Sequence, residues 1–238
     1  MHTYEKPLGR MLILSLFLLG QTPICAETND EGTRLKELVI QAMTTKSLEH
    51  KSESLESVPG DLAAQRTEQI AQQLVRLSNK KVQIRIVKGL SNPASLASGE
   101  ILIPARGMNR FTEGEIHFII AHELAHIELQ HLKAVIKLAA HDCPMYEGDA
   151  PDFILQVGQC IRKNLEEPTE LGPVLRRLKW RHEHESDLWA TQFLSRHKLP
   201  NDYRTLFEKL KSVEDSGLSE THPPADQRLH TIEQLLAK

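Results

Sequence analysis

The chain has 238 residues, which is enough for one domain or two small ones with a sizeable buried core. Hydrophobic residues make up 40% and charged residues 26%, and this balance excludes a disordered chain, a fibre and a polytopic membrane protein. Because 29 basic residues face 32 acidic ones, giving a net charge of -3, there is no basic excess to predict nucleic acid as a partner.

The N-terminus is typical of a secretory signal. Lys6 and Arg10 precede the apolar run 11–20, and the small residues Cys25 and Ala26 follow at the expected cut. The run is about half as long as the roughly 20 residues that a membrane span needs. We therefore expect residues 1–26 to be a signal peptide that is removed after export to the periplasm or the medium. The alternative is an uncleaved N-terminal anchor.

Two cysteines remain after such a cleavage, Cys143 and Cys160. In an oxidising compartment an even pair predicts one disulfide, whereas two free buried thiols are the alternative. The bond would close a loop of about 18 residues, which is worth roughly 3 kcal/mol in the chain-entropy treatment.

Residues 27–60 are polar and predict a weakly ordered lead-in to a domain at 61–238. Asp61 is a suitable N-cap for a helix over 61–79, whose apolar residues fall on one stripe. Alternation at 82–86 predicts a half-buried strand, and Glu100–Pro104 a second one.

A long helix follows, with Thr112 as its N-cap and Glu115 at the capping-box position. Its apolar pattern extends to about residue 140. Together these elements predict an α+β, mainly α fold with a small β-sheet beside the long helix. Further helices are expected at 152–165, 173–197, 201–212 and 225–237.

The long helix carries the motif HExxH, with His122, Glu123 and His126. Residues four apart on a helix differ by about 40° in azimuth and about 6 Å in height, so both imidazoles can reach one ion. Glu123 is poorly placed to be a third ligand but well placed to hydrogen-bond a water at the metal. The motif therefore predicts a zinc site, although a surface helix with solvated histidines is the alternative.

A catalytic zinc needs a third protein ligand, and the segment 180–190 is the obvious source. Glu183 and Asp187 are four apart and share a helix face, so Asp187 can accept the outer N–H of a ligating imidazole if Glu183 binds the metal. Glu185 is the competing ligand, about 200° away from Glu183. An ordinary salt-bridged helix is the alternative for this segment.

These motifs resemble the zinc metallopeptidases of family forty-eight, which include the heat-shock protease HtpX and the CAAX prenyl endopeptidases. The resemblance spans roughly residues 61–238. Four segments carry it: the helix HELAH continued to His131, the element ExxxDxxA at 183–190, the element THPP at 221–224 followed by Arg228, and the segment 92–104 before the active-site helix. Pro93 departs from the family pattern in the last of these.

The resemblance implies a zincin-like fold and one Zn²⁺ per chain, held by His122, His126 and Glu183. Glu123 would then take a proton from water at the metal and pass it to the leaving amine. His222 resembles the family histidine that stabilises the oxyanion, although a simple turn residue is the alternative.

Other residues receive supporting roles from the same resemblance. Arg228 would tie the terminal helix to the site, and His131 would be structural or lie behind the ligands. We expect the strand Glu100–Pro104 to offer an open edge to an extended peptide. The expected substrate-binding residues are Asn92, Ala94, Glu100, Ile101 and Leu102.

The sequence thus predicts an exported zinc metalloendopeptidase without a transmembrane bundle. Its partners would be extended or misfolded polypeptides, with possible association with envelope proteins, and its role protein quality control. A zinc-binding chaperone-like or autoinhibited homologue is one alternative, and a structural helical protein without metal is another.

Overall fold

The structure is a computed structural model, and it describes residues 60–78, 80–90, 92–96, 99–142, 171–214 and 222–237. Several predictions lie outside these residues and stay predictions. They are the signal peptide at 1–26, nearly all of the lead-in at 27–60, the Cys143–Cys160 disulfide, the helix at 152–165 and Thr221.

Three short strands form a mixed sheet: β1 (Gln83–Val87), β2 (Ala94–Ser95) and β3 (Glu100–Pro104). Their order is β1-β3-β2, and β3 runs parallel to β1 and antiparallel to β2. Strand β3 is therefore central, since Ile101 and Leu102 pair with β1 on one side and with β2 on the other. The predicted open edge at β3 is wrong, because β2 pairs with β3 on the side that β1 leaves free.

Helix α2 (Leu62–Leu77) precedes the sheet and packs on it and on α3. Asp61 caps it as expected, with its carboxylate accepting a hydrogen bond from the Ala64 amide at 2.8 Å. Ile70 and Leu74 lie on the buried stripe of the helix and join the main core. The cap and the stripe together explain why this polar-rich segment forms one helix.

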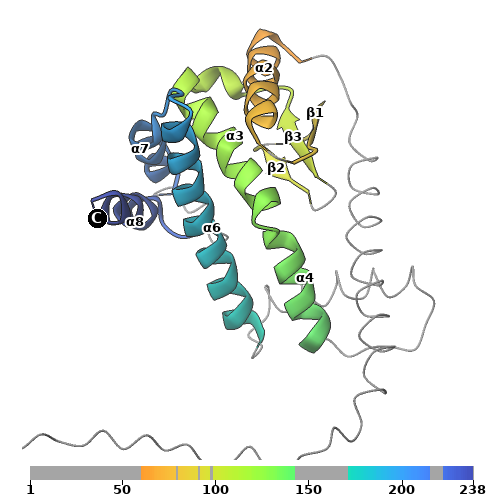
Figure 1. Cartoon of the computed structure of the whole chain (residues 1–238), viewed down its shortest axis with the longest axis vertical. Helices are drawn as coiled ribbons and strands as arrows, with labels where there is room; N and C mark the ends of the chain where they lie inside the picture. The colour runs from red at the N-terminus through yellow and green to blue at the C-terminus, as the bar shows by residue number, and fades with distance from the viewer. Residues whose placement is uncertain are drawn as a thin grey trace, which may run out of the picture.

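Helix α3 (Glu113–Glu128) is the central element, with the sheet and α2 on one side and the later helices on the other (Figure 1). The predicted capping box is present, because Thr112 and Glu115 each bond the other's backbone N–H. Its core positions are fully buried. They are Ile116, Phe118, Ile120 and Leu124.

The expected continuation of this helix to residue 140 is wrong. Helix α3 ends at Glu128, Gln130 has a left-handed φ of 55°, and a new helix α4 starts (His131–Asp142). The Gln130 amide bonds the Ile127 carbonyl at 3.2 Å, so the ladder tightens and stops there. The break places His131 on a new helix and therefore changes which way its ring points.

Three helices complete the described fold: α6 (Leu171–Arg196), α7 (Tyr203–Glu214) and α8 (Ala225–Leu236). Helix α6 lies along α3 and α4, and α7 and α8 lie beyond it (Figure 1). The described residues are mainly helical with one small sheet, which confirms the predicted fold class. In this part of the chain, no helix combines the length and apolarity that crossing a bilayer requires.

The capping carboxylate of Glu115 is fully buried and also joins α3 to α7. Lys209 Nζ lies 2.6 Å from Oε2, and the Thr205 hydroxyl donates to Oε1 at 2.7 Å. Burial raises the pKa of Glu115, but these hydrogen bonds and that from Thr112 outweigh it and lower the pKa below its usual 4.5. The ionised form is therefore bound more tightly in the folded state than in the unfolded state.

We expect Glu115→Gln to lower the free energy of unfolding by about 1–3 kcal/mol at neutral pH, because a charged hydrogen-bond network is lost. A carboxyl with a lowered folded pKa stabilises the fold above its usual pKa and loses this effect as the pH falls through the folded value. The difference between wild type and variant should thus shrink below pH 4.5. Urea unfolding at several pH values measures it, and a difference independent of pH would contradict this account.

Candidate metal centre

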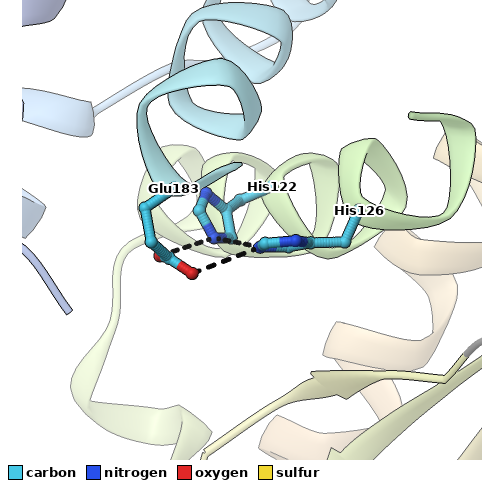
Figure 2. A group of neighbouring side chains, drawn as sticks. All are labelled: His122, His126 and Glu183. Atoms are coloured by element: carbon cyan, nitrogen blue, oxygen red, sulfur yellow. Dashed lines mark hydrogen bonds and ion pairs between the residues drawn. The ribbon is translucent and has the colours of Figure 1, made fainter. Parts of the chain in front are cut away.

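Three side chains from two helices converge on one point (Figure 2). His122 and His126 project from the same face of α3, and Glu183 reaches them from α6. The two Nε2 atoms lie 3.0 Å apart, and the Glu183 oxygens lie 3.4 Å from His122 Nε2 and 3.5 Å from His126 Nε2. The structure therefore brings the three predicted ligands together.

These distances fit a small divalent cation. In a tetrahedral zinc site with bonds of 2.0–2.1 Å, ligand atoms lie about 3.3 Å from one another. Glu183 Oε2 is buried and has no hydrogen bond within the described part of the chain. Arg228 Nη1 and His122 Nε2 each lie 3.4 Å from this oxygen, outside good hydrogen-bond distance, so a buried acceptor remains that a cation between the three side chains could use.

Behind His122 lies Asp187, four residues beyond Glu183 on α6. Its Oδ1 is 2.9 Å from His122 Nδ1. Arg228 from α8 donates two hydrogen bonds to this carboxylate, from Nε to Oδ2 at 2.7 Å and from Nη2 to Oδ1 at 2.6 Å. Arg228 Nη1 also lies 3.4 Å from Glu183 Oε2. The arginine therefore ties α8 to both carboxylates of α6.

Behind His126 lies His131, at the start of α4. The two Nδ1 atoms are 3.0 Å apart, and His131 Nε2 lies 3.2 Å from Glu185 Oε2. Glu185 thus does not join the three ligands, but it does reach the imidazole behind one of them. Each candidate ligand histidine has its outer nitrogen occupied, which leaves Nε2 facing the cation position in both.

The imidazole charges depend on these neighbours. Burial lowers the pKa of His122, but its contacts with Asp187 and then Glu183 outweigh burial and raise the pKa to about 10. Burial and the charge on His122 lower the pKa of His126 to about 3. For Glu183, burial raises the pKa, yet interactions with His122 and Arg228 hold it well below its usual range. The centre thus retains its carboxylate charge, which favours a cation.

Glu123 lies beside the centre and faces β2. Burial raises its pKa to about 6, although the charge on His122 and hydrogen bonds from the Ser95 side chain and backbone act in the opposite direction. A carboxylate with such a pKa is suited to take up and release a proton near neutral pH. The contact with Ser95 also ties the carboxylate to the edge strand.

His222 lies just before α8, with Nε2 3.8 Å from Glu183 Oε1 and about half of its side chain exposed. Burial lowers its pKa despite the nearby Glu183. It therefore stands at the solvent side of the centre, where a bound molecule can reach it.

The five predicted substrate-binding residues differ in exposure, and only some of them lie at the free edge of the sheet. Asn92 is exposed and Ala94 half-buried beside β2, whereas Ile101 and Leu102 are buried in the central strand. Glu100 is paired with Arg85 at 3.5 Å. Only Asn92 and Ala94 therefore lie at the sheet edge where a peptide can approach.

Sequence reasoning missed two contacts of the centre, Ser95 with Glu123 and Glu185 with His131. No local pattern signals Ser95, because its position depends on how β2 pairs with β3. For His131, the spacing after the HExxH motif was the available signal, but a continuous helix would have turned the ring about 140° away from His126.

Two comparisons with known proteins agree with this geometry. Residues 38–143, which include the HExxH helix, match the family described as BlaR1 peptidase M56. The chain is also 26% identical over 147 residues to the metalloprotease LoiP of Escherichia coli (strain K12), covering 59% of this chain and 57% of that protein. The chain thus spans a little over half the length of this curated relative. Both similarities are to metallopeptidases, and they support a metallopeptidase function for this chain.

Proposed function

We propose that the protein is a zinc-dependent endopeptidase that hydrolyses peptide bonds of extended or misfolded polypeptides. The observation that carries the proposal is the convergence of His122, His126 and Glu183 on one point with Glu123 beside it. The two metallopeptidase similarities support it independently.

Zinc is the metal that this donor set suits best. Two imidazole nitrogens and one carboxylate oxygen are a common catalytic zinc set, because they leave one of four positions open. When bound, zinc supplies Lewis acidity, which polarises a peptide carbonyl and acidifies water. His122, His126 and Glu183 would hold the ion, and Asp187 and His131 would orient the two imidazoles.

Glu123 supplies the proton transfer in this proposal. Its carboxylate accepts a proton from the attacking water and later returns it to the amine that leaves. His222, exposed at the edge of the centre, is placed to donate a hydrogen bond to the oxyanion that develops on the substrate. Ser95 keeps the Glu123 carboxylate in place while these steps occur.

The edge strand β2 indicates how a polypeptide would bind. It pairs with β3 on one side, and no further strand of the described chain pairs with its other side. An extended peptide can add to this side as another strand, so its backbone would run past Glu123. Such binding depends on backbone hydrogen bonds. It would therefore select extended, unfolded segments and would depend little on their side-chain sequence.

The setting that we propose is the periplasm or another exported location, with envelope proteins as substrates and quality control as the role. The signal-like segment 1–26 supports export. A zinc-binding chaperone-like or autoinhibited homologue is the rival, and it differs in one observable: it binds zinc and unfolded chains without cleaving them.

The test is digestion of an unfolded casein by the purified chain. We expect cleavage with stoichiometric zinc, loss of cleavage to the level of the blank after chelation, and recovery on adding zinc. His126→Ala should fall well below one zinc per chain by elemental analysis, because an imidazole ligand is lost. The matched control is His230→Ala, an exposed histidine on α8, which should bind zinc like the wild type. A zinc-loaded wild type that never cleaves casein would favour the rival.

A further inference from the structure

His131 is a buried imidazole that neither binds the proposed cation nor takes part in the proposed proton transfer, and it lies directly behind His126. The residue is 4% exposed, and its ring lies between His126 and Glu185. His182 stacks on it with ring centroids 4.1 Å apart and planes 5° apart, which sets the plane of the ring. The Ser186 hydroxyl lies 3.3 Å from its Nδ1. A ring held this firmly has a defined hydrogen-bond direction at each nitrogen.

The direction of each hydrogen bond follows from the cation site. If His126 offers the lone pair of Nε2 to a cation, its Nδ1 carries the hydrogen and donates it to His131 Nδ1. His131 must then accept at Nδ1, so it is neutral and carries its own hydrogen on Nε2. This hydrogen points to Glu185 Oε2, at 3.2 Å. A doubly protonated His131 would place two N–H groups against each other at 3.0 Å.

We propose that His131 and Glu185 are positioning residues that hold His126 in the tautomer with its lone pair on Nε2. Asp187 and Arg228 hold His122 in the corresponding tautomer from the opposite side. The proposal rests on the proposed zinc site. In this hydrogen-bond relay, which runs from His126 through His131 to Glu185, a neutral imidazole lies between the ligand and the carboxylate. Unlike the direct contact of Asp187 with His122, it therefore adds no buried charge next to the centre.

The relay also bears on a second group of possible ligands. Atoms of His131, His182 and Glu185 lie within 4.8 Å of one another, as a cation site would need. However, binding a cation through His131 Nε2 moves its hydrogen to Nδ1, which then faces His126 Nδ1 and forces a hydrogen onto His126 Nε2. The two sites therefore exclude each other, and we expect one tight zinc per chain.

The test compares two variants of the full chain. His131→Leu removes the acceptor, whereas His131→Asn places an amide oxygen near the position of Nδ1 and can still accept from His126. We expect zinc affinity, measured by competition with a chelator of known affinity, to fall about 10- to 100-fold in His131→Leu and to be largely restored in His131→Asn. The control is His117→Leu, the same change at a buried histidine of α3 outside the centre, which should leave zinc affinity unchanged.

A second readout does not depend on any variant folding. Nitrogen–proton NMR of the zinc-loaded wild type should show His126 protonated at Nδ1 and His131 protonated at Nε2. The opposite tautomer at His131, equal zinc affinity in folded His131→Leu and wild type, or two equally tight zinc ions per chain would each overturn the relay alone. A wild type that binds no zinc would overturn the proposed function and the relay together.

Discussion

Replacing Glu123 with Gln is expected to lower casein hydrolysis by about 10²- to 10⁴-fold, the range for loss of a general base or acid. The amide keeps the size of the side chain and an oxygen that can accept from Ser95, so the local structure should persist. It cannot take up the proton of the attacking water, and therefore the chemical step fails.

The measurement is the rate of casein cleavage together with the zinc content of each preparation. Zinc content should equal that of the wild type, because Glu123 is not among the three converging ligand residues. Glu128→Gln, a change of the same kind on the same helix, is the control and should retain activity. Wild-type rates in folded, zinc-loaded Glu123→Gln would sink the assignment of Glu123 as the proton carrier.

Replacing Arg228 with Met should cost about 3–5 kcal/mol of unfolding free energy, measured with urea in zinc-free protein. The cause is the fully buried Asp187, which would lose two charged hydrogen bonds and keep its charge, while Glu183 would lose a nearby cation. Met fills a similar volume, so the loss reports mainly on the missing charge.

Arg204→Met is the matched control for this change. Arg204 pairs with Glu233 at 3.1 Å, but its side chain is 65% exposed, so its removal should leave the free energy of unfolding nearly unchanged. Similar losses in the two variants would contradict the role given to Arg228. Arg228→Lys should lie between Met and wild type, since it keeps a charge without the two-pronged geometry.

The helices and the ligand spacing could be predicted from local patterns. Asp61 and Thr112 mark helix starts by their caps, and the structure has α2 and α3 beginning directly after them. The four-residue spacing of His122 and His126, and of Glu183 and Asp187, places each pair on one helix face whatever the rest of the chain does. Such features involve neighbours within one or two turns, so a linear pattern contains them.

Other features depended on contacts between distant segments. Strand β3 is a short apolar run whose sequence does not say how many strands pair with it, but pairing with both β1 and β2 makes it central and moves the free edge to β2. The break between helices α3 and α4 at Gln130 is not marked by a glycine or proline in the sequence. It nevertheless turns the His131 ring toward His126.

The amino-acid order alone was therefore sufficient for the helix faces and the candidate ligands, because hydrogen bonds and side-chain contacts within a helix are local. Packing of α4 and α6 against α3 was required to bring Glu183, His131 and Glu185 to those histidines, and pairing in the sheet was required to bring Ser95 to Glu123. These contacts join residues far apart in the chain, and no periodicity encodes which distant partner a buried polar group will meet.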